Sequence, residues 1–327
     1  MNNIINSRIK QTCFGLPNES LELDLTPLYE LQEDKVRVQV EATNINPSDL
    51  LSIRGVGQYR HHHIPPRVPG FEAVGHVFES NSPLFSKGER VLVATSGTWQ
   101  KYIDVKPDNL FRLPQNLENG YACQLYINAL TAWVVTTEVA HLSTQDVVII
   151  NAGTSAIGKI FAQLSASLGF TLIAVTTRPE NYVIDSAYVI DAKNDLNAQI
   201  QQLGLPQPNV AFDAIGGKAG YELLTTLSQQ GRLVNYGTLS FEFYEPRFFE
   251  HAKKFNIQFR TFFLRYWENQ VGTEVRRTTF YAMLEHFITN KIQLDIDRIM
   301  PLDQVIKAIT LIESKEIALH GKIILTP

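Results

Sequence analysis

The first third of the chain alternates between apolar and polar positions in short runs, a pattern typical of β-strands. VRVQVEATNI (36–45) alternates in polarity, and VGHVFE (74–79) and RVLVAT (90–95) are β-rich runs. Clusters of Pro, Gly and Ser bound these runs, and long helical patterns are few. Residues 1–123 are therefore expected to form a partly open β-barrel.

From residue 121 the pattern changes to apolar strand-like runs separated by helical stretches. Residues 121–139 carry apolar side chains at helical spacing, and 147–169 read as a strand, a turn of small residues and a helix. Strand-like runs then alternate with helical stretches: the strands TLIAVTT (171–177), AYVID (187–191), VAFDAIG (210–216) and RLVNYGTL (232–239), and the helices 194–203 and 218–229. This alternation predicts a doubly wound parallel sheet with right-handed crossovers.

The C-terminal segment returns to short strand-like runs, ITLIES (309–314) and GKIILT (321–326), which are expected to complete the first domain. The prediction is an α/β protein with one domain of residues 1–123 and 267–327 and a second domain of residues 124–266. The connection PENYVIDS is shorter than the roughly ten to twelve residues of an ordinary parallel crossover. Either this crossover is abbreviated or part of a loop is absent from the chain.

Composition narrows the classes of function. With 44% hydrophobic and 19% charged residues, the 327-residue chain resembles an ordinary folded protein of two domains. A net charge of −4 gives no reason to expect nucleic acid or an anionic membrane as partner. No apolar run approaches the roughly 18 residues of a membrane span, and no secretory signal is evident. Cys13 and Cys123 cannot form a disulfide framework, so a reducing cytoplasm is expected.

NAGTSAIG (151–158) lies where a nucleotide-binding turn belongs, between a strand and a helix. Helix-terminal N–H groups attract a pyrophosphate, and small residues let the backbone approach it. A strict G-x-G-x-x-G is absent, but Gly153 and Gly158 remain, and Ser155 and Ala156 are small. The turn is thus a candidate dinucleotide site, and an ordinary strand–helix turn is the alternative.

The end of the next strand bears on the type of cofactor. NAD sites usually carry an Asp or Glu there, which binds the ribose hydroxyls. This chain has Thr176, Thr177 and Arg178 instead, which suit a 2′-phosphate through charge-assisted hydrogen bonds. NADPH is therefore favoured over NADH, unless Arg178 is simply a solvated surface residue.

Taken together, these segments resemble the zinc-free branch of the medium-chain dehydrogenase/reductase superfamily. Within that branch the chain is similar to 2-enoyl thioester reductases and to proteins called NADPH:quinone reductases. The resemblance covers almost the whole chain and implies a GroES-like barrel domain and a Rossmann domain. It rests on the following segments in order: NINPSD (44–49), Tyr59 through PGFEAVG (69–75), GTWQKY (97–102), INALTAW (127–133), NAGTSAIG (151–158), AIGG (214–217), VNYGTL (234–239), FFLRYW (262–267) and GKIIL (321–325).

The resemblance also implies which residues bind the cofactor. Asn128 matches an asparagine beside the nicotinamide, and Lys322 matches a cofactor-contacting lysine. The remaining positions are Gly153, Thr154, Ser155, Ala156, Ile157 and Gly158 at the pyrophosphate, Thr176, Thr177 and Arg178 at the adenosine phosphate, Tyr236, Gly237, Thr238, Leu239, Phe262, Phe263, Leu264 and Arg265 at the nicotinamide end, and Asn46 and Thr131. Ordinary roles are the alternatives: core for Phe262 and Phe263, solvent exposure for Lys322, and strand packing for Tyr236.

Histidines gather around Glu72 and raise the question of a zinc site. Zinc-dependent members of the superfamily need an early thiolate and a His–Glu pair, whereas here Ser48-Asp49 and Phe71 stand at those places. The side chains of His61–His63 would point to alternate faces of an extended segment, so they cannot converge on one ion. They are expected in an exposed loop, with His76 on a strand, and no metal site is expected.

Tyr59 is the candidate catalytic residue. The related reductases carry a tyrosine thirteen residues before the Glu that matches Glu72, and Tyr59 keeps this spacing. A phenol remains protonated at neutral pH and can donate a hydrogen bond to a carbonyl oxygen on which negative charge builds. Arg60 replaces the family's usual glycine, which places a fatty acyl carrier substrate in doubt. An exposed loop tyrosine is the alternative.

The function expected from the resemblance is an NADPH-dependent reductase that transfers hydride to a quinone or an activated C=C of an enoyl thioester or enal. A non-catalytic NADPH-binding redox sensor and a zinc alcohol dehydrogenase are the alternatives. The expected partners are a small-molecule hydride acceptor and a second copy of the chain, with no nucleic acid and no membrane. The alternating segment VNYGTLSFEFYEP (234–246) could form the sheet edge of such a homodimer.

Overall fold

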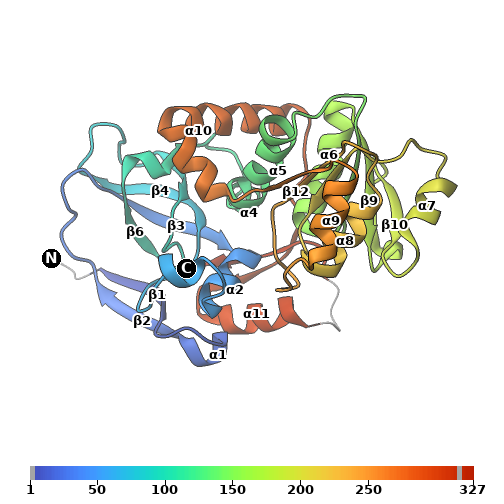
Figure 1. Cartoon of the computed structure of the whole chain (residues 1–327). Coiled ribbons are helices and arrows are strands. Elements are labelled where there is room, and N and C mark those ends of the chain that lie inside the picture. Colours follow the sequence, from blue (N-terminus) through green and yellow to red (C-terminus); the bar gives the residue numbers. More distant parts are fainter. Residues whose placement is uncertain (1–3, 315–318) are drawn as a thin grey trace. The chain divides into compact units, whose positions relative to one another are not determined.

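The computed structural model describes residues 4–314 and 319–327 and divides into two compact units (Figure 1). One unit comprises Met1–Ile127 and Leu294–Pro327, and the other comprises Asn128–Gln293. The expected boundary at 266/267 falls inside helix α10 (Leu264–Thr289), which belongs to the second unit. Within that unit, Trp267 and Thr279 of α10 both donate hydrogen bonds to Glu138. Such side-chain contacts between distant segments are not visible in the polarity pattern.

The first unit contains a seven-stranded sheet in the order β14-β15-β3-β4-β5-β7, with β6 paired to β3, and a separate β1–β2 hairpin. Its strands are β1 (Ile5–Gln11), β2 (Leu21–Pro27), β3 (Val36–Asn44), β4 (Glu72–Ser80), β5 (Arg90–Ala94), β6 (Tyr102–Val105), β7 (Leu110–Arg112), β14 (Ile296–Pro301) and β15 (Lys322–Thr326). Its helices are α1 (Pro17–Ser20), α2 (Pro47–Arg54), α3 (Tyr59–His62), η1 (Pro107–Asn109), α4 (Asn119–Ala122), η5 (Leu302–Gln304) and α11 (Val305–Glu313).

Two apolar clusters hold this unit together. Alternate residues of β3 (Val36, Val38 and Val40) face the barrel interior with residues of β4, β5, β6 and β7, as the alternating pattern predicts. A second cluster joins α2, α11 and the C-terminal strands (Figure 1). The expected barrel is therefore present.

The segment 309–314, expected as a strand, lies in helix α11 except for its last residue. Its β-branched residues suggest a strand, but Val305, Ala308 and Ile309 follow the helical i, i+3, i+4 spacing and are buried. The strand prediction was wrong because packing of this apolar helical face outweighs β-propensity.

The second unit is built on a six-stranded parallel sheet in the order β10-β9-β8-β11-β12-β13, a doubly wound Rossmann arrangement. Its strands are β8 (Val147–Ile150), β9 (Thr171–Thr176), β10 (Tyr188–Asp191), β11 (Val210–Asp213), β12 (Arg232–Asn235) and β13 (Gln258–Thr261). Its helices are α5 (Thr131–Val134), η3 (Val135–Val139), α6 (Ala156–Leu168), η4 (Pro179–Asn181), α7 (Leu196–Gln202), α8 (Gly217–Thr225), α9 (Pro246–Lys254) and α10. A π-helical segment, η2 (Leu125–Leu130), spans the division between the units.

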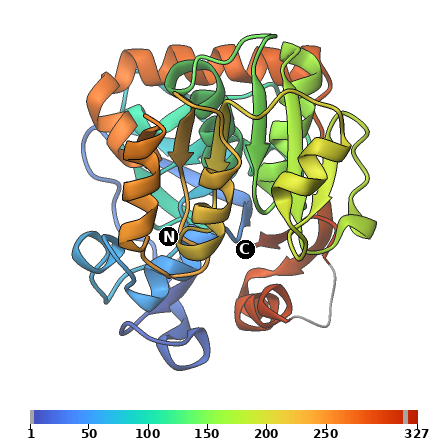
Figure 2. The ribbon, with the colours of Figure 1, turned by 45° about the vertical axis from the view of Figure 1, so that its right-hand side comes forward.

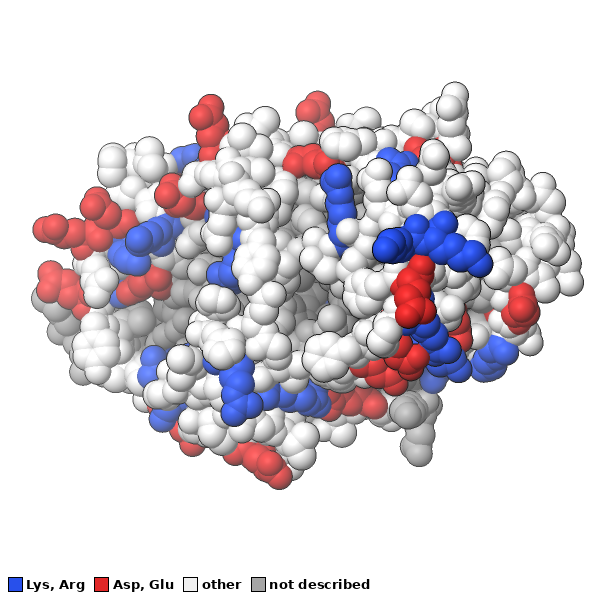
Figure 3. Space-filling view, in the orientation of Figure 1, with Lys and Arg blue, Asp and Glu red and all other residues white. Residues whose placement is uncertain are grey.

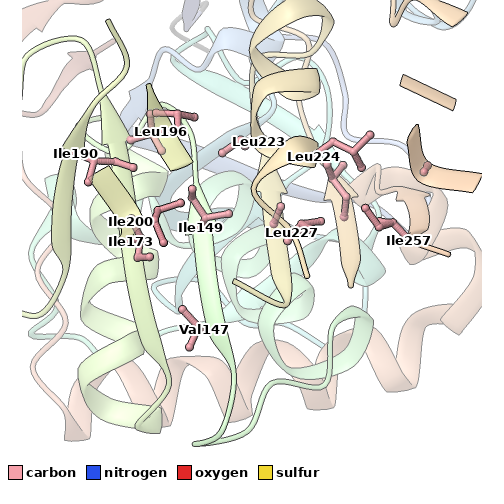
Figure 4. Close-up of a cluster of buried hydrophobic side chains, with 14 of the residues drawn as sticks. Val147, Ile149, Ile173, Ile190, Leu196, Ile200, Leu223, Leu224, Leu227 and Ile257 are labelled. Atoms are coloured by element: carbon pink, nitrogen blue, oxygen red, sulfur yellow. The ribbon is translucent and has the colours of Figure 1, made fainter. Parts of the chain in front are cut away.

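Helices cover both faces of this sheet (Figure 2). On one face, Ile149 and Ile173 pack with side chains of α7, α8 and α9 in the cluster of Figure 4. On the other face, Phe161 of α6 contacts Phe212 of β11, with ring centroids 4.9 Å apart. Burial on both faces accounts for the nearly continuous apolar runs of the strands.

Two connections of this unit bear on the sequence predictions. Between β9 and β10 the described chain forms only the 3₁₀ turn η4 in place of a crossover helix. Residues 236–245 form no strand, and the edge strands of the sheet are β10 and β13. The expectation that 234–246 forms the edge was therefore wrong: beyond β12 the chain turns, and Leu239 and Ser240 donate N–H groups back to the loop after β11. No helix in the described residues is long and apolar enough to cross a membrane.

Candidate functional site

The turn between β8 and α6 is shaped for close approach of its backbone. Ser155 caps α6, because its hydroxyl accepts the N–H of Gly158 at 3.1 Å. A Cβ on Gly158 would lie 2.5 Å from the carbonyl oxygen of Gly153 and 2.7 Å from that of Ala152. Gly158 therefore lets the turn fold against the first turn of the 13-residue helix. The remaining helix-terminal N–H groups suit a pyrophosphate.

The end of β9 lies beside this turn. The hydroxyls of Thr154 and Thr176 are 3.2 Å apart, and the N–H of Arg178 donates to the Thr176 hydroxyl. Gly153 donates its N–H to the carbonyl oxygen of Val175. The predicted pyrophosphate and adenosine-phosphate residues are thus joined by hydrogen bonds within one unit.

A cavity of about 330 Å³ opens at this place. Four predicted cofactor residues line it: Thr154, Ser155, Thr176 and Thr177. The sequence reasoning did not name the other lining residues: Asn151, Ala152, Val175, Ala192, Leu196, Ile215, Ala219, Glu222 and Leu223. Several of these follow the ends of β8, β10 and β11, where ligands bind in open parallel sheets, so strand ends were the missed signal.

The cavity contains one carboxylate, that of Glu222 on α8. Its oxygen lies 3.7 Å from the ammonium of Lys218, and its side chain is 43% exposed. From the end of β9, Thr176 and Thr177 line the wall, and neither carries a carboxylate. Hydroxyl groups thus stand at the end of β9, on the wall of the cavity.

The residues predicted for the nicotinamide end occupy several settings. Asn128 and Thr131 are buried in η2 and α5. Tyr236 is half-buried, and its hydroxyl is buried without a hydrogen-bond partner in the described chain. Burial and the nearby charge of Asp213 raise the pKa of this phenol. Phe262 is half-buried rather than core, and its N–H donates to the carbonyl oxygen of Asn235.

The remaining predicted residues of this group lie in the two connections that flank β13. Gly237 packs against the loop after β11, where a Cβ would lie 2.5 Å from the carbonyl oxygen of Ala214. Phe263 caps α10, which begins with Leu264 and Arg265, and all three are half-buried.

In the first unit, Glu72 is the centre of a buried polar network. One carboxylate oxygen accepts the side-chain amides of Asn44 at 3.0 Å and Asn46 at 2.7 Å. The other accepts the N–H groups of Tyr126 and Ile127, both at 2.9 Å. Burial raises the pKa of Glu72, and these hydrogen bonds oppose that shift. Glu72 thus fixes the start of η2.

Lys322 completes the network from β15. Its ammonium donates to the carbonyl oxygen of Ile45 at 2.9 Å and to the side-chain oxygen of Asn46 at 2.6 Å. Lys322 is 8% exposed, so the alternative of a solvent-facing lysine does not apply. Burial lowers its pKa to about 8, against the opposing effect of Glu72 and Asp49. Both amide hydrogens of Asn46 are used, by Asn44 and Glu72, and its side-chain oxygen accepts from Lys322.

Tyr59 lies at the start of the short helix α3 and is half-buried. Its ring packs 6.1 Å from Phe71 and 5.9 Å from His63, centroid to centroid. His63 is buried against Phe71, whereas His61 and His62 are exposed. The expectation of an exposed loop is therefore wrong in part: Tyr59–His62 form the short helix α3, and His63 is buried in an aromatic cluster.

His76 lies on β4 as expected, where one ring nitrogen contacts the carboxylate of Glu41 at 2.7 Å. In the part of the chain that the structure describes, no three His, Cys, Asp or Glu side chains are grouped so that they could hold a metal ion.

Comparisons with known proteins place this geometry in context. Residues 32–115 match the family described as alcohol dehydrogenase GroES-like domain, and residues 184–325 match the family described as zinc-binding dehydrogenase. The mitochondrial enoyl-[acyl-carrier-protein] reductase of Arabidopsis thaliana is 31% identical over 250 residues, which cover 69% of this chain and 64% of that protein. The Xenopus tropicalis protein of the same name is 30% identical, over 69% of this chain and 68% of that protein. The chain spans 64% of the length of the Arabidopsis relative.

Among solved structures, a Bacillus thuringiensis protein described as an NADPH:quinone reductase is 32% identical to this chain. The two superpose with a TM-score of 0.90, over 99% of each chain. The chain belongs to the medium-chain dehydrogenase/reductase superfamily. It is accordingly an oxidoreductase with the expected GroES-like and Rossmann architecture.

A more distant member of this superfamily shares the fold. The structure of Escherichia coli quinone oxidoreductase complexed with NADPH is 21% identical to this chain. It superposes with a TM-score of 0.85 over 98% of this chain and all of the other. At this identity the likeness concerns the fold alone.

Proposed function

We propose that this oxidoreductase uses NADPH and transfers hydride to a quinone or to an activated C=C of an enoyl thioester or enal. The observation that carries the choice of cofactor is the end of β9. There Thr176 and Thr177 line the cavity and Arg178 follows them, and no carboxylate stands in the place that would bind a ribose diol. Relatives called enoyl reductase and quinone reductase support both classes of acceptor.

The chain's own residues would bind and orient the cofactor, which when bound supplies the hydride. N–H groups at the start of α6 would hold the pyrophosphate, with Gly153 and Gly158 permitting its approach. The hydroxyls of Thr176 and Thr177 and the guanidinium of Arg178 would donate to the 2′-phosphate. We assign Asn128, Tyr236–Leu239 and Phe262–Arg265 to the nicotinamide end. Asn46, Thr131 and Lys322 remain proposed cofactor contacts.

The catalytic residue that we propose is Tyr59. Its phenol would donate a hydrogen bond to the acceptor oxygen, which gains negative charge as hydride reaches the β-carbon. The aromatic rings of Phe71 and His63 pack against the Tyr59 ring and restrict its movement, so less conformational entropy is lost when that hydrogen bond forms. Arg60 is exposed beside Tyr59, and with His61 and His62 it could attract an anionic substrate carrier.

The test combines binding and turnover. Fluorescence titration should give a Kd for NADPH at least about tenfold below that for NADH, and Arg178→Ala should remove most of this difference. Lys253→Ala, at an exposed position of α9, is the matched control. Equal affinity for both cofactors would contradict the choice of NADPH.

Oxidation of NADPH is then followed with crotonyl-CoA, 1,4-benzoquinone and an α,β-unsaturated aldehyde. The acceptor with the highest kcat/KM identifies the substrate class. Tight NADPH binding without turnover of any acceptor would favour a redox sensor. Bound zinc together with alcohol oxidation would favour the zinc enzyme.

We further propose a homodimer formed through the open edge strand β13, in the reducing cytoplasm. β13 presents unpaired backbone groups, and an antiparallel copy of the same strand could satisfy them. Cys13 and Cys123 are both free thiols, as a reducing compartment requires. On the face in Figure 3, acidic and basic side chains are interspersed, so that face offers no basic stripe to nucleic acid. Light scattering after size-exclusion chromatography tests the dimer.

A further inference from the structure

Asp213 is a fully buried carboxylate at the carboxyl end of β11. One of its oxygens accepts the side-chain amide of Asn151 at 2.6 Å. The same oxygen accepts the N–H groups of Ile215 and Gly216, both at 2.9 Å. It thereby joins the connection after β8 to the connection after β11.

The other oxygen of Asp213 joins a third connection. It accepts the hydroxyl of Tyr244 and the side-chain amide of Asn235 at 3.3 Å. The same amide group of Asn235 donates to the carbonyl oxygen of Gly237 at 2.8 Å. Asn235 ends β12 and Tyr244 lies nine residues later, so Asp213 binds both ends of the connection that follows β12.

The packing around this carboxylate leaves no room for change. A Cβ on Gly220 of α8 would lie 2.2 Å from the Asp213 oxygen and 2.7 Å from the Tyr244 ring. All these hydrogen-bond donors to Asp213 are uncharged. A buried carboxylate is stable only when such donors surround it, so loss of any one donor disturbs the whole arrangement.

The joined connections are those that form the nucleotide cavity. Asn151 and Ile215 line it, and both donate hydrogen bonds to Asp213, Asn151 from its side-chain amide and Ile215 from its backbone N–H. The side-chain oxygen of Asn151 also accepts the N–H of Ala214 at 2.7 Å. Carboxyl ends of parallel strands are where ligands bind in such sheets.

We propose that Asp213 is a positioning residue for the cofactor cavity, which holds the connections after β8, β11 and β12 in the arrangement that binds the dinucleotide. Tyr244 is its second component, because its hydroxyl fixes the far end of the connection after β12. This inference rests on the proposed NADPH binding.

The same sheet provides a matched control at the opposite ends of these strands, where they begin. Asp146 is also buried and accepts hydrogen bonds from Ser143, Asn209 and Arg232. Ser143 precedes β8, Asn209 precedes β11, and Arg232 begins β12. Asp146 thus joins the starts of the three strands whose ends Asp213 joins, and none of these residues lines the cavity.

The experiment compares Asp213→Asn, Tyr244→Phe and Asp146→Asn in the full chain. NADPH affinity is measured by fluorescence titration well below the unfolding temperature, and stability is measured by thermal unfolding without cofactor. We expect Asp213→Asn to raise the NADPH Kd at least about tenfold and Tyr244→Phe about threefold. Asp146→Asn should lower the unfolding temperature at least as much as Asp213→Asn does. Its NADPH Kd should stay within about twofold of that of the unaltered chain.

Two results would overturn the inference alone: unchanged NADPH affinity in the Asp213 and Tyr244 variants, or an equal loss of affinity in Asp146→Asn. If Asp213→Asn does not fold, Tyr244→Phe decides, because it removes a single oxygen from a half-buried ring. Failure of the unaltered chain to bind NADPH would instead refute the proposed function, and this inference with it.

Discussion

The chemistry proposed for Tyr59 can be removed by deleting one oxygen atom. Tyr59→Phe keeps the ring that packs on Phe71 and His63 but loses the hydrogen-bond donor. We expect kcat for an enoyl thioester to fall about 100-fold, as when one donor to a developing oxyanion is lost. Tyr29→Phe, at a position 75% exposed in the same unit, should leave kcat unchanged. Full activity of Tyr59→Phe would exclude Tyr59 from the mechanism.

Asp49 predicts a specific dependence of stability on pH. Burial, with a smaller contribution from Glu72, raises its pKa from 3.8 to about 7, although the Asn46 N–H, Lys322 and Arg67 oppose the shift. Between these values the folded state binds more protons than the unfolded state, so the contribution to stability is full at low pH and is lost as pH rises toward 7.

The change that tests this is Asp49→Asn, which remains neutral at every pH. Relative to the unaltered chain, the variant should gain on the order of 3 kcal/mol in free energy of unfolding between pH 4 and 8. Urea unfolding at several pH values measures the difference. Asp34→Asn, at an exposed position, is the control, and two parallel pH curves for Asp49→Asn and the unaltered chain would contradict the prediction.

At the residue scale the sequence did not reveal the hydrogen-bond partners of the predicted site residues. In the sequence, Glu72 marks the place of a His–Glu pair and the spacing to Tyr59, whereas in the structure it binds Asn44, Asn46 and the start of η2. Lys322 lies 276 positions from Asn46 in the chain, yet it donates to that side chain. Such pairings depend on how strands β3, β4 and β15 are ordered, which polarity patterns do not reveal.

The turn between β8 and α6 acts as one element whose shape depends on Gly158. In Gly158→Ala the new Cβ would meet two carbonyl oxygens of the turn at 2.5 and 2.7 Å. We expect a loss of about 1–3 kcal/mol in stability and at least a tenfold rise in the NADPH Kd. Ala166→Gly, at an exposed position of the same helix, should cost about 1 kcal/mol in stability without changing the Kd. Equal effects of the two variants on the Kd would contradict this view of the turn.

Several elements, most of them in the second unit, follow from periodicity alone. The alternation of β3 and the strand–turn–helix pattern of β8 and α6 predict these elements closely, because one buried face imposes each period. The pattern fails for α11, where β-branched residues lie on a helical face. It fails also for residues 236–245, where hydrogen bonds to the loop after β11 replace strand pairing.

The whole molecule should respond to cofactor unevenly, because the cavity lies within the second unit. NADPH at about 100 times its Kd should stabilise that unit by about 2.7 kcal/mol, since ligand binds only the folded form. Scanning calorimetry measures this as a higher unfolding temperature, and NADH at the same concentration should raise it less. No shift with NADPH would contradict the binding site.

The abbreviated connection between β9 and β10 has a consequence for engineering. Its single 3₁₀ turn leaves Val183 75% exposed and Tyr188 45% exposed. A helix grafted between Asn181 and Tyr188 could bury this apolar surface against the sheet, as ordinary crossovers do. Because Thr176 and Thr177 immediately precede this loop, its length offers a means of altering how fast a nucleotide enters and leaves. The residence time of the bound nucleotide could then be tuned by inserting residues into this loop rather than by point substitution.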